Sequence, residues 1–580
     1  MIRLGHCVLL ALLAALFGCA PSLRVAERAQ AQAERLKASD LEAKSPVPSP
    51  LFALAQADRE RHRALLIERG EEALLLRLHL IRAARETIDL QTYIFADDAS
   101  GRLLLAELLA AAQRGVRVRL LVDQLFSLPD EALLAGLAIS HRGFSIRLYN
   151  PTFRRARTSA PEFAAGILCC FQNFNRRMHN KLLVVDGLIA LIGGRNVENR
   201  YFDWDPAYNF RDREVLLSGP AVREMEDSFT RFWEHPVSHP AERLGGVAER
   251  ILRGEVAEPD VAVPSPWRER GAMLRALADD PPFIARHFAA LFVPVERIEY
   301  FSDRPGKPWG HRDPAARDFT SVMKAAIGAA REEVLLQTPY LVLSRQARRL
   351  FAKLADRPEP PALMVSTNSL AATDAFFVYA LSHKYKRLYL RRLKLAIFEW
   401  KPFAEDAPPY LAGLSFLRGA LGAKPPMPRV GLHAKTLIID RRSAIIGSHN
   451  FTPRSADINT ENGVLIEDAR FVARLRETIL RDMRGENAWR IARRERLPVL
   501  GSVSALASAI SESLPLFDLW PWRYATSYEK RPGCPELEPG DPGFAQCYRD
   551  VGAFPEAPLP LKRLPTLLVT AFGIGLEPIL

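Results

Sequence analysis

The feature that most constrains this chain is an internal repeat. IRAARETIDLQTY begins at Ile81, and the similar IGAAREEVLLQTPY begins at Ile327, 246 residues further on. A second pair, HNKLLVVDGLIALIGGRN from His179 and HAKTLIIDRRSAIIGSHN from His433, lies 254 residues apart. Two similar elements in the same order indicate two copies of one unit of roughly 200 residues, a period too long for a solenoid. We therefore expect two pseudo-symmetric lobes.

The first copy has an α/β pattern. Residues 81–95 read as the end of a helix running into a strand, residues 101–115 as an amphipathic helix, and residues 116–123 as the next strand. Apolar residues make up 48% of the chain and charged residues 25%, which is typical of folded soluble domains. The fold class predicted for each lobe is therefore α/β, as an α/β/α sandwich.

The domain boundaries follow from the repeat and from changes in composition. We expect the first lobe at 49–245, a connecting segment at 246–290, the second lobe at 291–500 and a C-terminal extension at 501–580. The extension contains FDLWPW and ends in the apolar LPTLLVTAFGIGLEPIL. That end either lies in a membrane interface or packs back onto a lobe.

The N-terminus has the pattern of a secretory signal. Arg3 precedes the apolar CVLLALLAALF, and LFGC closes the segment at Cys19. This ending resembles the lipobox of bacterial lipoproteins, which implies a signal peptide at 1–18, lipid on the Cys19 thiol and a tether at 19–48. The alternative is an uncleaved membrane anchor, against which Pro21 argues. We expect a lipid-anchored protein of the bacterial cell envelope that faces the periplasm, with the choice of inner or outer membrane open.

The remaining cysteines fit that compartment. Cys534 and Cys547 lie in a loop-rich stretch and are candidates for a disulfide in an oxidising periplasm. Cys169 and Cys170 are adjacent, and adjacent cysteines rarely bond each other. No cysteine spacing matches a zinc site.

The second repeated pair places chemistry on one face of a strand. Because alternate side chains of a strand share a face, His179 and Lys181 point the same way, and so do His433 and Lys435. Asp186-Gly187 is a strong hairpin signal. The returning strand brings Gly193 and Gly194 opposite His179, where small residues permit close approach.

Each copy then adds a carboxamide at the same distance. Asn196 follows His179 by 17 residues, and Asn450 follows His433 by 17. Imidazole, ammonium and carboxamide suit a phosphate diester: one His attacks phosphorus, the other protonates the leaving oxygen, and Lys and Asn hold the other oxygens. No cluster of thiols or carboxylates accompanies them, so we expect neither a metal nor another cofactor.

The two motifs resemble the paired HxKxxxxD motifs of the phospholipase D superfamily. Within it, the chain resembles bacterial cardiolipin synthases of the C type, over about residues 75 to 480. The supporting stretches include RRMHNK, LIGGRN, STNSLAATD and FTPRSADINTENG. The resemblance implies two lobes packed about a pseudo-two-fold axis, with a single active site at their interface.

The resemblance also implies roles for the repeated residues. His179 would be the nucleophile that forms a phosphohistidine, and His433 the general acid and then base; this polarity comes from the family and not from the repeat. The residues expected to bind the phosphoryl group are Lys181, Lys435, Asn196 and Asn450. Asp186 and Asp440, which end the motifs, are expected to support loops.

A carboxylate is expected to orient each histidine through its other nitrogen. Glu461, 28 residues after His433, matches this role in the second lobe. In the first lobe RDREV offers Asp212 and Glu214 for His179. We prefer Glu214 from its place in a strand-like run, but Asp212 shares its face.

The expected partners are phospholipids. The phosphatidyl group would pass to the alcohol of a second phospholipid, or to water as in a phospholipase D. A net charge of +12 also suits polynucleotide, so a nuclease or other phosphodiesterase is the alternative, although the expected anchor favours lipid. A catalytically idle scaffold is disfavoured because both motifs are intact.

The residues just before the first motif leave two interpretations open. The basic ones either engage anionic headgroups or are solvated loop charges; they are Arg154, Arg155, Arg157, Arg176 and Arg177. The apolar ones either line an acyl-chain approach or fill core; they are Phe171, Phe174 and Met178.

Overall fold

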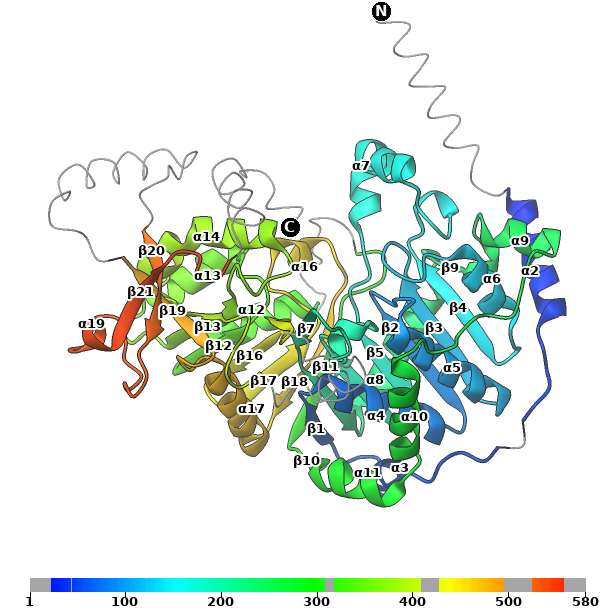
Figure 1. Cartoon of the computed structure of the whole chain (residues 1–580), viewed down its shortest axis with the longest axis horizontal. Helices are drawn as coiled ribbons and strands as arrows, with labels where there is room; N and C mark the ends of the chain where they lie inside the picture. Colours follow the sequence, from blue (N-terminus) through cyan, green and yellow to red (C-terminus); the bar gives the residue numbers. More distant parts are fainter. Residues whose placement is uncertain (1–21, 43, 308–317, 408–426, 495–523, 558–580) are drawn as a thin grey trace, which may run out of the picture.

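The computed structural model describes residues 22–42, 44–307, 318–407, 427–494 and 524–557. It has two lobes side by side, each built on one large mixed sheet (Figure 1). The expected signal peptide, Cys19, FDLWPW and the apolar C-terminal stretch lie outside the described residues. None of the described helices is both long and apolar enough to cross a bilayer.

The first lobe holds a nine-stranded sheet in the order β10-β1-β8-β6-β5-β2-β3-β4-β9. Its strands are β1 (Arg63–Ile67), β2 (Thr87–Thr92), β3 (Arg117–Asp123), β4 (Phe144–Tyr149), β5 (Leu182–Val185), β6 (Ile189–Gly193), β8 (Glu214–Ser218), β9 (Ser238–Pro240) and β10 (Val293–Pro294). Its main helices are α4 (Gly70–Ala83), α5 (Ala99–Gln113), α6 (Glu131–Ile139) and α8 (Ala221–Glu234). Strands β2, β3 and β4 are parallel, with α5 and α6 as their crossovers.

The second lobe holds a ten-stranded sheet in the order β11-β18-β17-β16-β12-β13-β14-β19-β20-β21. Its strands are β11 (Arg297–Ser302), β12 (Glu333–Gln337), β13 (Ala362–Asn368), β14 (Ala396–Trp400), β16 (Thr436–Ile439), β17 (Ser443–Gly447), β18 (Asn462–Glu467), β19 (Ala488–Arg493), β20 (Ala525–Lys530) and β21 (Tyr548–Gly552). Its main helices are α12 (Phe319–Ala329), α13 (Arg345–Ala355), α14 (Phe376–Arg391) and α17 (Ala469–Asp482). From β1 to β9 and from β11 to β19 the strand orders correspond, so the expectation of two pseudo-symmetric α/β lobes is confirmed.

One apolar cluster joins the lobes. It contains Met225 and Phe229 of α8, Ile298 of β11 and Leu475 of α17, all of them buried. Burying one such side chain contributes about 1.5–3 kcal/mol of stability. Because several are buried between the lobes, this shared core stabilises their association.

The repeated motifs form hairpins. Asp186 and Gly187 both have positive φ (54° and 59°) between the antiparallel β5 and β6, as the Asp-Gly pair predicted. Asp440 and Arg441 adopt the same conformation (51° and 57°) between β16 and β17. The fold tolerates a non-glycine second residue there.

The described part of the expected tether is largely helical. Helix α2 (Leu23–Leu36) packs on α9 (Val247–Arg253), which follows the first lobe in the chain. Its buried residues are Ala26, Ala29 and Ala33, whose spacing places three small side chains on one helix face. The chain continues to a short helix, α3 (Pro50–Ala57).

The connecting segment and the C-terminal extension also add to the lobes. The connecting segment contains α9, α10 (Trp267–Ala278) and α11 (Pro281–His287). Strand β10, inside the range expected for the second lobe, pairs with β1 of the first. In the extension, β20 and β21 lengthen the second sheet, and α19 (Phe544–Cys547) lies between them in the chain.

Two disulfides are present. Cys534 bonds Cys547, the pairing that the loop-rich stretch suggested. Cys169 bonds its neighbour Cys170, contrary to the expectation for adjacent cysteines. This bond lies in α7 (Ala160–Asn175), where the helix is interrupted because Cys170 leaves helical geometry (φ −136°, ψ 32°).

Candidate active site

Each motif histidine is placed by the backbone of the other lobe. The His179 N–H donates to the Thr460 carbonyl (3.0 Å), and the His433 N–H donates to the Arg211 carbonyl (2.8 Å). A small two-stranded sheet between the lobes, β7 (Tyr208–Arg211) with β15 (Arg429–Leu432), runs directly into the second contact. Both histidines therefore lie at the lobe interface.

The carboxylates that hold the histidines also cross the interface. His179 Nδ1 lies 2.8 Å from Glu461 Oε2, and His433 Nδ1 lies 2.6 Å from Asp212 Oδ2. The sequence-based assignment of Glu461 to His433 and of Glu214 to His179 is therefore wrong. The segments that carry Glu461 and Asp212 reach across the pseudo-two-fold, so each acid meets the histidine of the other copy.

Glu214 has a different role. Its carboxylate accepts hydrogen bonds from Arg77 Nη1 (2.9 Å) and Arg195 Nη1 (3.5 Å) inside the first lobe. Asp212 and Glu214 do not share a strand face as predicted, because the chain leaves β7 at Asp212 and enters β8 only at Glu214.

Close packing in the first lobe requires its double glycine. A Cβ on Gly194 would lie 2.3 Å from Asp212 Oδ1, and a Cβ on Gly193 would lie 2.3 Å from the Arg213 carbonyl. Any larger side chain at position 194 would therefore displace the acid that holds His433.

Burial sets the protonation of the histidines and their acids. It lowers the pKa of His179 to about 4 despite the opposing effect of Glu461, and it lowers the pKa of His433 to about 4 with help from Lys435. Burial opposes ionisation of Glu461 and Asp212, but the neighbouring imidazoles and cationic side chains together outweigh it and hold both pKa values below the ordinary range. Near neutral pH each neutral ring can donate its Nδ1 proton to a carboxylate and present a lone pair at Nε2.

The two lysines lie beside the histidines. Lys181 Nζ donates to the His179 carbonyl (2.7 Å), and Lys435 Nζ donates to the His433 carbonyl. Burial lowers the pKa of Lys181 to about 7 and that of Lys435 to about 8, partly against the attraction of the site's carboxylates. Both pKa values therefore lie close to neutral pH.

The two asparagines differ in their contacts. Asn196 Nδ2 donates to the Tyr201 hydroxyl (2.9 Å), which lies 3.4 Å from His433 Nε2. Asn450 accepts a bond from Thr338 at its backbone carbonyl (2.8 Å), and within the described ranges its buried Oδ1 has no hydrogen-bond partner.

Asp186 and Asp440 close loops, as expected. The Asp186 carboxylate accepts the backbone N–H groups of residues 85–87, at 2.8–2.9 Å. The Asp440 carboxylate accepts those of residues 331–333, at 2.7–3.0 Å. Each aspartate thus ties its hairpin to the loop before the neighbouring strand.

Each motif histidine also contacts a tyrosine ring that the sequence did not predict. Tyr93 packs edge-on against His179 with ring centroids 4.9 Å apart, and Tyr201 does the same against His433 at 5.0 Å. Tyr93 ends the repeated IDLQTY, so the first repeated element carries part of the site.

A pair of polar strand ends was also missed. The residue before each histidine donates its backbone N–H to such a residue: Met178 to Asp123 Oδ2 (2.9 Å), and Leu432 to Asn368 Oδ1 (2.7 Å). Both acceptors end corresponding strands, VRVRLLVD and ALMVSTN, with a polar residue after an apolar run. A polar residue at the end of an apolar run was therefore the sequence pattern that could have predicted these two acceptors.

The residues before the first motif divide into two groups. Arg177 is fully buried and pairs with Asp123, while Phe174 and Met178 are buried, so these three belong to the packing around His179. Arg154 and Arg157 are exposed, and Arg176 is half-buried. Among the described residues, no three His, Cys, Asp or Glu side chains are grouped so as to hold a metal ion.

Two corresponding lobes with paired His, Lys and carboxylate groups at their interface define a phosphodiester-handling enzyme of the phospholipase D type. The family model described as "Cardiolipin synthase, PLD-like domain" matches residues 78–233 and 323–483, and the chain is an enzyme that belongs to this family. It is 34% identical over 409 residues to cardiolipin synthase C of Escherichia coli (strain K12), covering 69% of this chain and 80% of that protein.

The chain is also similar to a second bacterial protein and to a solved structure. An uncharacterized protein of Helicobacter pylori (strain ATCC 700392 / 26695) is 29% identical over 437 residues, covering 74% of this chain and 81% of the other. The solved phosphatidylserine synthase of Haemophilus influenzae Rd KW20 is 13% identical with a TM-score of 0.45, covering 74% of this chain and 91% of that one.

Proposed function

We propose that this enzyme transfers a phosphatidyl group from one phospholipid to the alcohol of another, as a cardiolipin synthase does, through a phosphohistidine on His179. The family and the similarity to cardiolipin synthase C support the reaction class. The observation that carries the proposal is the site itself: two neutral imidazoles, each held at Nδ1 by a carboxylate from the opposite lobe.

In the first step His179 Nε2 attacks phosphorus. A P–N bond forms, the P–O bond to the leaving alcohol breaks, and His433 gives that oxygen a proton. The negative phosphate beside His433 raises the pKa of this imidazole on binding, so the ring can carry the proton that the step needs.

In the second step the acceptor alcohol gives its proton to His433 and attacks phosphorus. A new P–O bond forms, the P–N bond breaks, and His179 returns to its neutral form. Water in place of the alcohol gives phosphatidic acid, so transfer depends on the alcohol reaching the site before water does.

Differences between the two rings support this assignment of roles. In the described structure no protein group bonds His179 Nε2, so its lone pair is available for attack. His433 Nε2 lies 3.4 Å from the Tyr201 hydroxyl, and Lys435 Nζ lies 2.7 Å from its Nδ1. With these polar neighbours, the His433 ring is better suited than the His179 ring to accept and release a proton.

The lysines and asparagines would hold the non-bridging oxygens. Lys181 and Lys435 bring positive charge to the site from both lobes, with Asn196 and Asn450 beside them. Groups already fixed where charge develops in a transition state typically contribute several kcal/mol.

We also propose that the protein is anchored through lipid on Cys19 and faces the periplasm. The N-terminal pattern supports this, and so do the two disulfides, because disulfides persist in oxidising compartments. Metabolic labelling with a fatty acid should mark the wild-type chain and not Cys19→Ser; equal labelling of both chains would disprove the anchor.

The central test is lipid analysis of a strain that lacks other cardiolipin-forming enzymes. Cardiolipin should appear with the wild-type chain and be absent with His179→Ala at matched protein levels. Phosphatidic acid alone would indicate a hydrolase, and the absence of both products would overturn the phospholipid assignment.

A further inference from the structure

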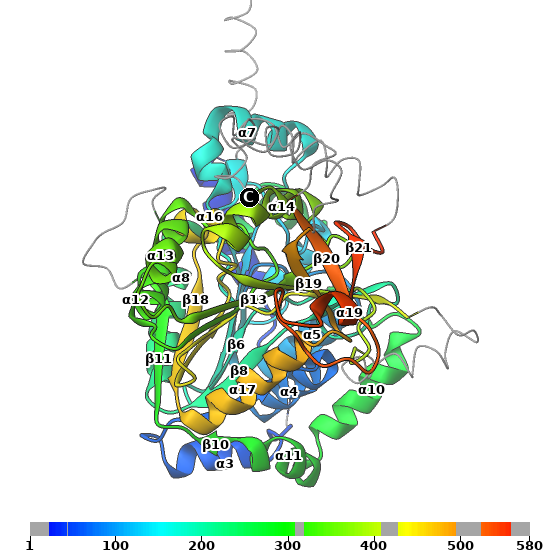
Figure 2. The ribbon, with the colours of Figure 1, turned by 90° about the vertical axis from the view of Figure 1, so that its left-hand side faces the viewer.

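Helix α7 projects from the first lobe in two perpendicular views (Figures 1 and 2). It ends at Asn175, four residues before His179. From Phe163 to Asn175 the sequence FAAGILCCFQNFN contains no charged residue. The helix thus connects a projecting, uncharged part of the surface directly to the segment that carries His179, just before β5.

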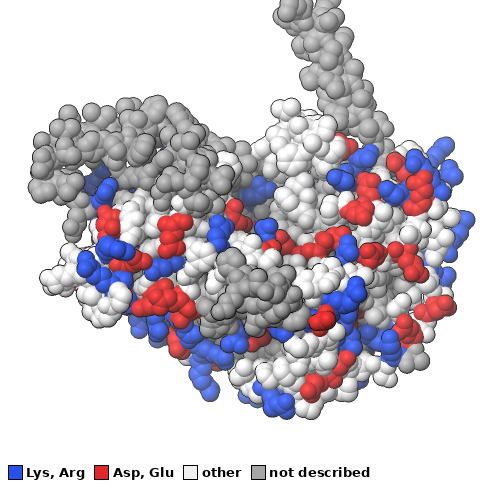
Figure 3. All heavy atoms as spheres, viewed as in Figure 1, with Lys and Arg blue, Asp and Glu red and all other residues white. Residues whose placement is uncertain are grey.

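The outer side of α7 exposes large apolar side chains. Leu168 is 86% exposed, Phe163 41% and Ile167 40%. The projection is white in the charge-coloured view (Figure 3). Leaving a leucine in water instead of burying it costs about 1.5–3 kcal/mol, which favours a partner that covers this side.

Both ends of the helix, where it joins the lobe, are flanked by basic residues; this part is called its base. Arg154 and Arg157 are exposed and precede the helix in the chain, and Arg176 follows its last turn. Glu162, the acidic residue of α7, is already engaged by Arg155 (3.2 Å) and by the Ser159 hydroxyl (2.8 Å). An apolar tip above a basic base is typical of helices that lie in the interface of an anionic membrane.

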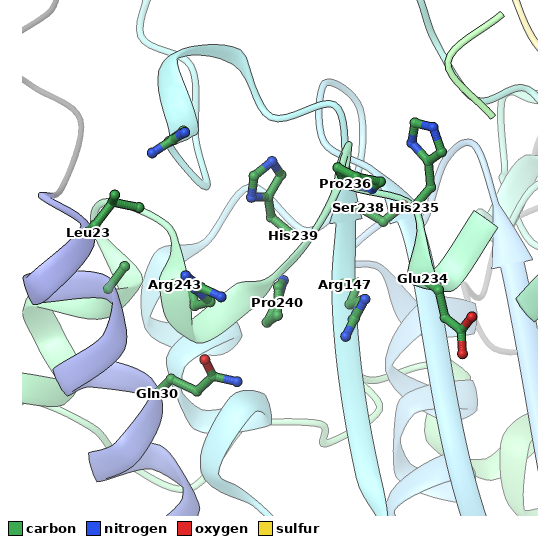
Figure 4. Close-up of a pocket in the computed structure, with 12 residues that line it drawn as sticks. Leu23, Gln30, Arg147, Glu234, His235, Pro236, Ser238, His239, Pro240 and Arg243 are labelled. Carbon is green, nitrogen blue, oxygen red and sulfur yellow. The ribbon is translucent and has the colours of Figure 1, made fainter. Parts of the chain in front are cut away.

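A basic pocket of 290 Å³ lies beside this base (Figure 4). Among its lining residues are Arg147, Arg154, Arg243, His235 and His239. Within the described chain, none of these three guanidinium groups forms an ion pair with a carboxylate, although Glu234 also lines the pocket and Arg147 donates to the Trp233 carbonyl. Burial and the same three arginines lower the pKa of His239, so positive charge is concentrated there.

The pocket and the helix share one part of the fold. Arg147 lies on β4, Arg154 lies in the short 3-10 helix η1 (Thr152–Arg154), and α7 begins six residues later. Asn150 Nδ2 donates to the carbonyls of Asn173 and Arg176 (both 2.7 Å), which ties the end of α7 to the end of β4.

We propose that this face docks on an anionic phospholipid bilayer, with Phe163, Ile167 and Leu168 entering the interface and the arginine pocket taking the phosphate of an anionic headgroup. This inference rests on the proposed function, because it names the surface from which His179 draws its lipid. Docking places the segment that carries His179 at headgroup level.

Hydrogen exchange of the full chain on vesicles tests the docking. Exchange of residues 160–175 should slow on vesicles of phosphatidylcholine with phosphatidylglycerol, and less on phosphatidylcholine alone. Because exchange is read segment by segment, the result does not depend on how the N-terminus is held. Unchanged exchange of α7 on the anionic vesicles would overturn the proposal.

Leu168→Asp tests the apolar tip. It should lower turnover of vesicle phospholipid about tenfold and leave turnover of a monomeric short-chain phospholipid unchanged, since a charge in the interface opposes insertion. The matched control is Met273→Asp, an exposed apolar residue on α10, which should change neither. Equal vesicle turnover by Leu168→Asp and wild type would disprove the docking.

The arginine pocket is tested with Arg154→Gln combined with Arg243→Gln. This variant should lose the extra protection that anionic vesicles give and keep that given by neutral ones. The control Arg286→Gln, on α11, should behave as wild type. If inorganic phosphate protects residues 235–243 as well as anionic vesicles do, the pocket binds free phosphate and the headgroup assignment is wrong.

Failure of the proposed function would look different. If the wild-type chain turned over neither vesicle nor monomeric phospholipid, the proposed reaction would be wrong. The exchange experiment would still show whether α7 contacts the bilayer.

Discussion

The two halves of the active site share a backbone plan and differ in side chains. His179 is held by Glu461, which also accepts a hydrogen bond from Ser448. His433 is held by the shorter Asp212, and Gly194 occupies the position that corresponds to Ser448. The longer acid is paired with a serine and the shorter acid with a glycine that lets it approach. The repeat has thus conserved the geometry at Nδ1 while allowing the chemistry around it to diverge.

The difference continues at the reactive nitrogens. Tyr201 bridges Asn196 and His433 Nε2, whereas Tyr93 contacts the His179 ring only edge-on. A symmetric site could start the reaction from either side. This site is asymmetric at the two nitrogens to which we assign attack and proton transfer, and the following experiments are designed to separate the two halves.

The largest separation should come from the histidines themselves. His179→Ala and His433→Ala should each lower phospholipid turnover by about 10⁴-fold or more. With a p-nitrophenyl phosphodiester, whose leaving group needs no acid, His433→Ala should recover a burst of p-nitrophenol and His179→Ala should not. A burst from His179→Ala instead would reverse the assigned roles.

The crossed carboxylates should give the next largest effect. Glu461→Gln and Asp212→Asn should each lower turnover by about 10²- to 10³-fold, because the imidazole loses the group that fixes its tautomer. Only Asp212→Asn should be partly rescued by the p-nitrophenyl leaving group.

Glu214→Gln is the matched control for these carboxylates. It should lower the free energy of unfolding by about 3–5 kcal/mol, since it leaves Arg77 and Arg195 short of their buried partner. Folded Glu214→Gln protein should keep wild-type dependence on the leaving group. If it instead copies Asp212→Asn, the crossed pairing is wrong.

The lysines should set an alkaline limit on activity. Their ammonium groups lose the proton as pH rises through about 7 for Lys181 and about 8 for Lys435, and the site then loses positive charge. The value of kcat/KM should therefore fall about tenfold per pH unit on this limb. The limb for kcat should lie at higher pH, because bound phosphate raises both pKa values.

Lys181→Arg should move that limit to higher pH, since a guanidinium keeps its proton across this range. Some loss of activity is expected from the change of shape, so the position of the limb is the informative readout. An unmoved alkaline limb would mean that another group causes it.

The smallest effect should come from the tyrosines. Tyr201→Phe removes the hydroxyl between Asn196 and His433 Nε2 and should lower turnover about fivefold, the equivalent of about 1 kcal/mol. Tyr93→Phe should have less effect, because its contact with His179 is through the ring edge. Equal effects of the two variants would argue against the asymmetry at Nε2.

Local patterns were sufficient for the fold and for the core of the site. The repeat predicted the lobes, and the Asp-Gly pair predicted a turn with two positive φ angles. The paired motifs identified each histidine with its lysine, but the expectation that both lie in a strand is wrong, because they precede β5 and β16. Each of these features is visible in the sequence itself, either as a repeated segment or as a pattern among neighbouring residues.

The carboxylate partner of each histidine could not be predicted from such local patterns. They are decided by how two surfaces far apart in the sequence meet, and equal spacing within a lobe gave the wrong pairing for Glu461 and Glu214. The break between β7 and β8, which turns Asp212 toward the interface, has no periodic signal. Tyr201 was missed for the same reason, since its partner belongs to the other copy.

The crossed carboxylates have a consequence for the evolution of the chain. After a duplication, two copies of a domain usually drift independently, because each can be repaired by changes within itself. Here a small shift of the segment that carries Asp212 would remove the carboxylate partner of a histidine 221 positions away, in the other copy. Selection therefore acts on the pair as one heritable unit, and compensating substitutions should be sought across the interface before they are sought nearby.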